Sequence, residues 1–100
     1  LRTRHKLMDT PPARARAAIV NKRGLHARAS AKFVETVARY NCEVTVSKDG
    51  QTVSGRSIMG LMMLGASMGT SIELCATGPQ AMEAMGALMA LIAAKFHEDA

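Results

Sequence analysis

The spacing of polar and apolar residues predicts helices in three parts of the chain and strands between them. Over residues 27–40 the charged positions recur at spacings of four, three and four, which is the period of an amphipathic helix. We expect one face of this helix to point to solvent and the other to pack in the core. The predicted solvent face carries Arg28, Lys32, Glu35 and Arg39, and the predicted core face carries Ala27, Ala31, Val34, Val37 and Ala38.

Four shorter segments have the pattern of β-strands. An apolar run at residues 15–21 ends in a polar loop, and residues 42–47 alternate with a period of two. An Asp-Gly pair, typical of hairpin turns, separates this second segment from a third strand at residues 51–54. Residues 70–77 are predicted as the fourth strand, because their apolar side chains fall on one face.

Two further helices complete the predicted order of elements, β-α-β-β-α-β-α. Ser57 is placed to cap a short helix over residues 58–64, which Gly65 ends. Pro79 is expected at the first position of a final helix that extends to Phe96. A sheet with helices on one face is the economical packing for these elements. The predicted apolar stripe of the last helix consists of Met82, Met85, Met89, Ile92 and Phe96.

Composition indicates a single small domain that does not bind nucleic acid. Aromatic residues make up 3% of the 100 residues, so the core is expected to consist of Ala, Val, Leu, Ile and the eight Met. Residues 1–16 carry a net charge of +4 out of the total of +5, which leaves the rest of the chain nearly neutral. We therefore expect a flexible basic extension at residues 1–13, a folded domain at 14–100, and no basic stripe for nucleic acid.

Membrane insertion, disulfide bonding and metal binding are all disfavoured by the sequence. No apolar run approaches the roughly 20 residues that span a bilayer. Cys42 and Cys75 lie far apart in strand-like runs without metal-ligand spacing, so two buried free thiols are favoured over a disulfide. These features predict a cytoplasmic protein with no metal and no cofactor.

The residues around His26 have the chemistry of a phosphate site. His26 lies where a loop becomes the helix of residues 27–40, and the N–H groups of the first helical turn attract anions. Gly24 can adopt positive φ and turn the chain sharply. The planar guanidinium of Arg28 has several N–H donors whose geometry matches phosphate oxygens. These observations indicate a histidine that carries a phosphoryl group, although a lone histidine beside an arginine is more often a surface or capping residue.

The short middle helix is apolar around nearly its whole circumference. A surface helix buries only a stripe against its sheet, so some of these side chains must face water unless the helix is sunk between the sheet and the longer helices. We expect Leu61 and Leu64 to point at the sheet. The predicted docking surface, on the side where His26 would lie if both helices began at the same end of the sheet, consists of Ile58, Met59 and Met62.

The segment Gly24-Leu25-His26-Ala27-Arg28 resembles the phosphorylation-site signature of the HPr family, the histidine phosphocarriers of the bacterial phosphotransferase system. The resemblance covers residues 15–99. Its second landmark, a serine that opens the middle helix, is matched by Ser57. Two further stretches, at residues 72–80 and 96–99, are more similar to the nitrogen-related branch of the family than to the sugar-transport branch.

This resemblance implies an α+β fold, an open-faced β-sandwich with an antiparallel sheet in the order 1-4-2-3 and three helices on one face. It implies that His26 accepts a phosphoryl group from Enzyme I, charged by phosphoenolpyruvate, and passes it to an Enzyme IIA-type protein, in sugar transport or in nitrogen and carbon regulation. The chain would thus be a monomeric stoichiometric carrier and not an enzyme. Arg28 would bind the phosphate, and Ser57 would be phosphorylated by an HPr kinase/phosphorylase, as in many relatives. Gly24 and Arg28 are expected to contact partners together with the docking surface.

One position departs from the family pattern, and two other functions stay open. The family usually has proline directly after the arginine, whereas this chain has Ala29, which keeps its N–H and holds the helix start less rigidly. A regulatory interaction protein that acts only through the apolar surface is the main alternative. An enzyme that uses His26 as a general base is less favoured, because no nucleophile or paired carboxylate is identifiable near this loop.

Overall fold

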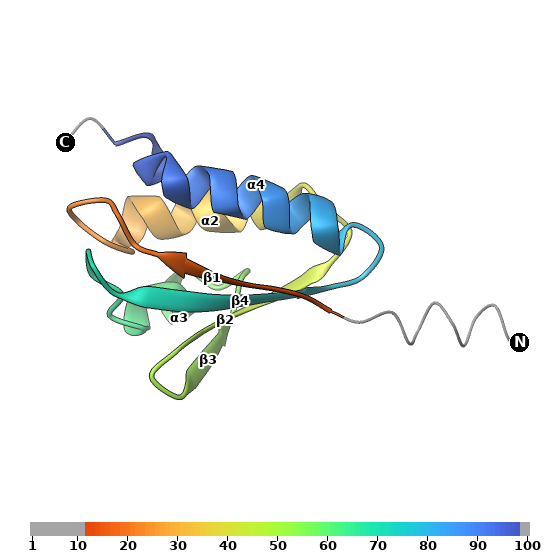
Figure 1. Cartoon of the computed structure of the whole chain (residues 1–100), viewed down its shortest axis with the longest axis horizontal. Helices are drawn as coiled ribbons and strands as arrows, with labels where there is room; N and C mark the ends of the chain where they lie inside the picture. The colour runs from red at the N-terminus through yellow and green to blue at the C-terminus, as the bar shows by residue number, and fades with distance from the viewer. Residues whose placement is uncertain (1–11, 99–100) are drawn as a thin grey trace, which may run out of the picture.

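The computed structural model describes residues 12–98, which form an antiparallel sheet with helices packed against it (Figure 1). The sequence order of elements agrees with the predicted β-α-β-β-α-β-α, with a short 3₁₀ turn added at the end. The strands are β1 (Ala13–Ala18), β2 (Glu43–Lys48), β3 (Gln51–Ser54) and β4 (Ser71–Thr77). The helices are α2 (Ala27–Ala38), α3 (Ile58–Met63) and α4 (Ala81–Ala93), followed by the 3₁₀ turn η1 (Lys95–His97).

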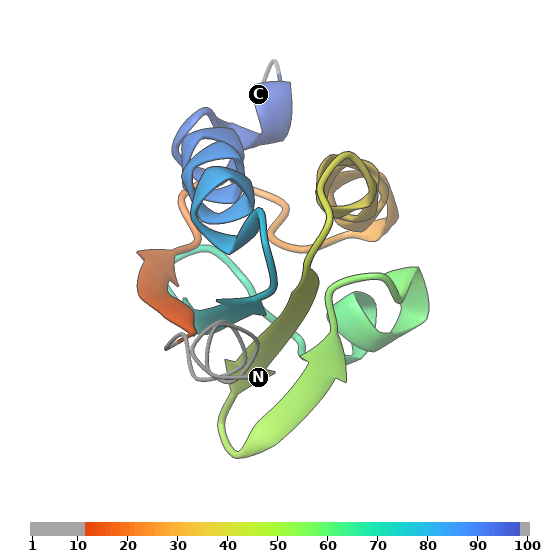
Figure 2. The ribbon, with the colours of Figure 1, turned by 90° about the vertical axis from the view of Figure 1, so that its right-hand side faces the viewer.

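The four strands lie in the order β1-β4-β2-β3, and every neighbouring pair is antiparallel. Val44 pairs with Ala76 and Val46 with Leu74, and all four side chains are buried, because alternate residues of a strand point to the same face. Figure 2 shows the helices on one side of this twisted sheet, with the other side uncovered. The predicted open-faced α+β sandwich is confirmed.

The core lies between the sheet and the helices, and it contains less methionine than the composition suggested. Of the methionines among residues 12–98, Met85 alone is buried. The two phenylalanines, Phe33 on α2 and Phe96 after α4, are completely buried and stand among Leu, Ile, Val and Ala side chains. Branched aliphatic and aromatic side chains fill this core, while most methionines stay at the surface.

The core-facing side of α2 is rotated relative to the predicted one. Ala27 and Ala38 were expected in the core but are exposed. Phe33 is the largest side chain of the helix, and its burial determines which face turns inward. Two polar residues on that face are buried because each hydroxyl donates to a backbone carbonyl: Ser30 to Leu25 at 3.2 Å and Thr36 to Lys32 at 2.9 Å. The buried residues are Ala29, Ser30, Phe33, Thr36 and Val37.

Helix α4 is shorter than predicted at both ends. It begins at Ala81 with Gln80 in the N-cap position, so Pro79 is not its first residue. Met82, expected on the apolar stripe, is 75% exposed. The helix ends at Ala93, and Phe96 reaches the core from the following 3₁₀ turn. The buried face of the helix itself consists of Ala81, Ala84, Met85, Leu88, Leu91 and Ile92.

The first strand also lies earlier than predicted. It covers Ala13–Ala18 in place of residues 15–21, because Asn21 belongs to the following turn, in which Gly24 N donates to Asn21 O at 3.2 Å. The strand therefore includes one residue of the predicted extension. The rest of that extension up to residue 11 lies outside the described residues, as do residues 99–100.

Candidate functional site

The loop from β1 to α2 is tied to the loop that follows α3. Gly24 is buried and has φ +65°, and Leu25 N donates to Ala66 O at 2.9 Å. A Cβ atom at position 24 would lie 2.4 Å from Ala66 O and 2.9 Å from the Cα of Ser67, so the two backbones approach as closely as glycine permits. This packing fixes the position of His26, two residues later. A contact of Gly24 with a partner stays a prediction.

His26 is the N-cap residue of α2. Its backbone is extended, with φ −74° and ψ −179°, and its carbonyl accepts a hydrogen bond from Ser30 N at 2.9 Å. Its side chain makes no capping bond, so it leaves the N–H groups of Ala27, Arg28 and Ala29 uncapped. These N–H groups and the helix dipole favour an anion beside the imidazole.

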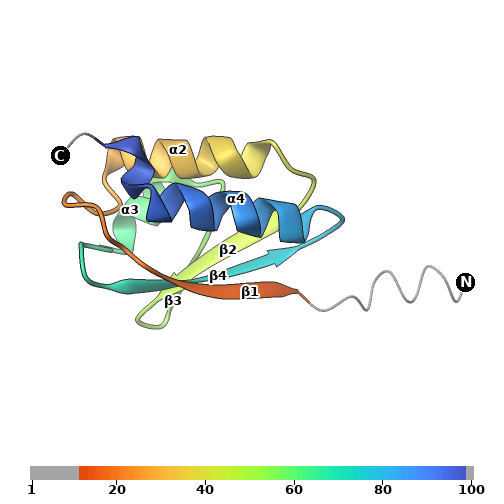
Figure 3. The same cartoon turned by 45° about the horizontal axis from the view of Figure 1, so that its top comes forward.

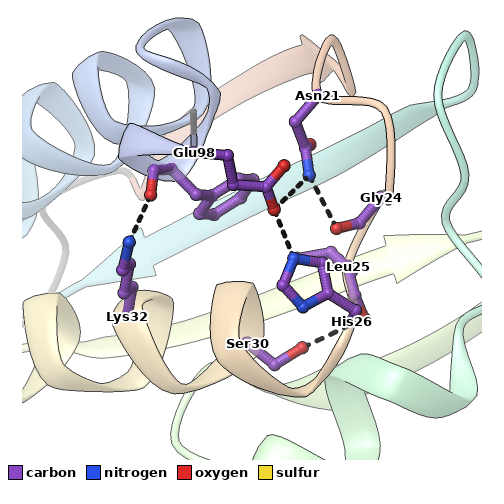
Figure 4. A network of polar contacts seen from close by, with 8 residues as sticks. Asn21, Gly24, Leu25, His26, Ser30, Lys32 and Glu98 are labelled. Atoms are coloured by element: carbon purple, nitrogen blue, oxygen red, sulfur yellow. Dashed lines mark hydrogen bonds and ion pairs between the residues drawn. The ribbon is translucent and has the colours of Figure 1, made fainter. Parts of the chain in front are cut away.

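The imidazole of His26 contacts a carboxylate that the sequence analysis did not single out. Figure 4 shows Nε2 of His26 directed at Oε1 of Glu98, with the other ring nitrogen, Nδ1, on the side of the ring away from that carboxylate. Asn21 Nδ2 donates to the same Oε1 at 3.1 Å and to Gly24 O at 2.9 Å. Glu98 thus joins the segment after α4 to the start of α2, and it lies 72 residues from His26 in sequence.

The surroundings of Glu98 keep it ionised. The hydrogen bond from His26 is the largest cause that lowers the pKa of Glu98 below its usual value. Partial burial acts in the opposite direction, while the Asn21 amide and the positive charge of Arg23 lower the pKa further. A carboxylate therefore faces Nε2 at neutral pH.

Arg28 and Ser57 lie on different helices. Arg28 is exposed in the first turn of α2 and makes no side-chain hydrogen bond with any other residue of the range 12–98. Ser57 caps α3 as predicted, since Gly60 N donates to its Oγ at 2.9 Å. The structure therefore places Arg28 in the first turn of α2 and Ser57 at the start of the middle helix.

The middle helix buries one stripe and exposes the rest. Leu61 and Leu64 are buried, while Ile58, Met59, Met62 and Met63 are exposed, so the alternative of a helix sunk on all sides is wrong. The exposed fractions of Ile58, Met59 and Met62 are 39%, 69% and 40%. Two more exposed methionines, Met63 on the helix and Met68 after it, were not predicted as part of this surface.

Helices α2 and α3 do not begin at the same end of the sheet, contrary to the expectation. β1 ends where its partner β4 begins, and the chain enters α2 from there. β3 ends toward the opposite end of the sheet, and α3 runs back from there (Figure 3). The loop after α3 then reaches the loop before α2, where Leu25 N donates to Ala66 O. The end of α3 is therefore nearer to His26 than its beginning at Ser57.

The remaining chemical predictions concern thiols, metals and membranes. Cys42 is buried and Cys75 half-buried, and both thiols are free. Burial raises the pKa of the Cys42 thiol. Residues 12–98 contain no cluster of three or more metal-ligating side chains. In the same range, the helices are too short or too polar to cross a membrane.

Comparison with known proteins identifies close relatives. A family model described as the PTS HPr component phosphorylation site matches residues 13–94. Phosphocarrier protein HPr of Neisseria meningitidis serogroup B is 54% identical over 80 residues, which cover 80% of this chain and 90% of the relative. Phosphocarrier protein NPr of Klebsiella oxytoca is 43% identical over 82 residues, covering 81% and 91%. The crystal structure of HPr-C-His from Thermoanaerobacter tengcongensis superimposes with a TM-score of 0.83 at 42% identity, covering 88% of this chain and 99% of that one. The matched residues run from β1 to α4 and include the loop that holds His26.

Proposed function

The chain belongs to the HPr family of phosphocarriers of the phosphotransferase system, and on that premise we propose that His26 carries the phosphoryl group from Enzyme I to an Enzyme IIA-type protein. The observation that carries this proposal is the position of His26 at the uncapped start of α2 with Nε2 bound to Glu98. Nδ1 is then the nitrogen with a free electron pair. The chain acts as a stoichiometric carrier and not as an enzyme.

In the proposed reaction, Nδ1 of His26 attacks the phosphorus of a phosphohistidine on Enzyme I. A P–N bond forms on His26 while the P–N bond of the donor breaks, and the donor imidazole keeps the electron pair of that bond. Negative charge on the transferring oxygens faces the N–H groups of the first turn of α2 and the guanidinium of Arg28. Ala29 contributes one N–H to this turn that proline in its place would lack.

Labelling with Enzyme I and phosphoenolpyruvate tests this proposal. We expect one phosphoryl group per chain, labile in acid and stable in alkali, and we expect His26→Ala to abolish labelling. The control is His97→Asn, because His97 is the other histidine of the range 12–98 and asparagine tolerates its φ of +58°. This control should label normally. Labelling of His26→Ala at the normal level would contradict the proposal, and failure of the wild type to label would favour an interaction protein that carries no phosphate.

The exposed side of α3, consisting of Ile58, Met59 and Met62, is proposed as the docking surface for both partners. Met59→Glu should leave the fold intact, because the side chain is 69% exposed. It should raise the apparent KM for Enzyme I and for the acceptor about five- to tenfold, the loss typical of a central apolar contact. Met82→Glu on α4, 75% exposed, is the matched control and should change neither KM. Unfolding of Met59→Glu, or equal effects of both variants, would count against this surface.

Ser57 is proposed as a site of negative regulation. Ser57→Asp should keep the melting temperature, since an aspartate can accept the hydrogen bond from Gly60 N and its charge is favourable at a helix start. The same charge lies beside the apolar docking surface and should slow phosphoryl transfer from Enzyme I severalfold. Ser57→Asn is a neutral cap of similar size and should transfer at the normal rate. If Ser57→Asp also transfers normally, Ser57 is a cap and not a switch.

The nitrogen-related assignment stays a prediction. It is tested by comparing the rates at which phosphorylated protein charges a sugar-specific and a nitrogen-related Enzyme IIA. A faster rate with the sugar-specific acceptor would contradict it.

A further inference from the structure

The segment after α4 has an unusual backbone. Three consecutive residues, none of them glycine, have a left-handed backbone conformation: Lys95, Phe96 and His97, with φ of +58°, +55° and +58°. Each such residue costs about 1–2 kcal/mol relative to a right-handed one. A run of three persists only where the surrounding contacts compensate for it. This segment is therefore held in place by specific contacts.

Two contacts hold the left-handed turn. The side chain of Phe96 is completely buried in the core, which anchors the middle of the turn. The carbonyl of the same residue accepts a hydrogen bond of 2.6 Å from Lys32 Nζ on α2. The turn is thus fixed both to the core and to the helix that begins at His26.

The result of this turn is the position of the Glu98 carboxylate. Its Oε1 contacts His26 Nε2 and accepts a hydrogen bond from Asn21 Nδ2, and Asn21 is completely buried. Because Asn21 also donates to Gly24 O, the amide is fixed at both hydrogens. Glu98 lies beyond residues 13–94, the range that the family model matches.

We propose that Glu98 is a positioning residue that keeps the proton of the His26 imidazole on Nε2 and thereby leaves the electron pair on Nδ1 for phosphoryl transfer. This inference rests on the proposed function of His26. Lys32 and the Lys95–His97 turn support it by holding Glu98 in place. The same carboxylate stabilises the ring once it becomes positively charged.

The proton and the charges balance in this step. Nδ1 gives its electron pair to phosphorus, the donor P–N bond breaks, and the Nε2 proton stays on the ring of His26. The phosphorylated ring is then an imidazolium, and its positive charge lies against the Glu98 carboxylate. On transfer to the acceptor, the Nδ1–P bond breaks and Nδ1 regains its electron pair. Among the described residues, the positive charge of Arg23 acts on the Glu98 carboxylate, and Arg28 and Lys32 lie on α2, the helix that His26 precedes.

The tautomer of His26 tests this inference without any partner protein. ¹⁵N NMR of the full chain at a pH where the ring is neutral should show Nε2 protonated and Nδ1 unprotonated. Glu98→Ala should give a mixture of both tautomers. Glu98→Gln should keep the wild-type tautomer, because Asn21 Nδ2 favours an oxygen at the position of Oε1. An unchanged tautomer in Glu98→Ala would overturn the inference.

Transfer rates give the second measurement. Glu98→Ala should accept phosphate from Enzyme I about tenfold more slowly, and Glu98→Gln should lie between it and the wild type, since it keeps the tautomer and loses the charge. Lys32→Met should slow transfer less than Glu98→Ala. Glu83→Ala, at an exposed position on α4, should have no effect. If Glu98→Ala transfers at the wild-type rate, the inference about Glu98 is overturned, while labelling of His26 would still support the proposed function. If His26 of the wild type is not labelled, the proposed function is wrong, while the NMR result on the tautomer is unaffected.

Discussion

Replacing Gly24 by alanine is expected to lower the free energy of unfolding by about 3 kcal/mol, the largest effect of a single substitution near the site. The φ of +65° is unfavourable for alanine, and the added Cβ would lie 2.4 Å from Ala66 O. Both neighbouring atoms, this oxygen and the Cα of Ser67, belong to the backbone and cannot rotate away. Urea unfolding measures the effect as a lower midpoint at an unchanged m-value.

Gly65→Ala separates the two causes of this loss. Gly65 has a similar φ of +62°, but a Cβ atom there would have no heavy atom within 4 Å. Gly65→Ala should therefore lower the free energy of unfolding by only about 1 kcal/mol, the cost of the unfavourable backbone conformation. Equal losses in the two variants would show that the contact between Gly24 and Ala66 does not constrain the loop.

Arg28→Ala is expected to slow phosphoryl transfer between Enzyme I and His26 by ten- to a hundredfold. A charge-assisted hydrogen bond to the transferring phosphate contributes about 1.5–3 kcal/mol, which corresponds to this range of rates. Stability should not change, since Arg28 is exposed. Arg28→Lys should recover part of the rate, because a lysine ammonium supplies the positive charge but not the two parallel hydrogen bonds that a guanidinium can donate to phosphate. Rapid-quench transfer kinetics measure all three proteins.

Arg39→Ala is the matched control for this prediction. Arg39 is an exposed arginine at the other end of the same helix, as the C-cap residue of α2. Arg39→Ala should transfer at the wild-type rate, because Arg39 is at the opposite end of α2 from the helix start where the phosphate is proposed to bind. If Arg28→Ala and Arg39→Ala slow transfer equally, the effect is one of overall charge and not of phosphate binding.

Much of the fold was predictable from local patterns. The alternation in residues 42–47, the Asp-Gly turn and the Ser57 cap each depend on neighbouring residues, and the structure confirms all three. The inward face of α2 was not predictable in this way, because the burial of Phe33 depends on the whole core. The direction of α3 relative to α2 also depends on where β3 ends, which sequence spacing does not reveal.

The same distinction applies to the site. His26, Gly24 and Arg28 lie within five residues, so their shared chemistry is visible in the sequence. Glu98 lies 72 residues from His26 and has no periodic pattern around it. Its position depends on a left-handed turn built from Lys95, Phe96 and His97, and lysine and phenylalanine give no sequence signal for positive φ. In the sequence, residues 96–99 are similar to the nitrogen-related branch of the family. That similarity gave no functional role to the Glu98 carboxylate.

The central claim is that His26 carries the phosphoryl group on Nδ1. The most direct test is ¹⁵N and ³¹P NMR of protein labelled at its histidines and phosphorylated by Enzyme I and phosphoenolpyruvate. The account predicts one phosphorus atom coupled to Nδ1 of His26, with a proton on Nε2. Phosphorus coupled to Nε2 of His26, or found on any other residue, would contradict it.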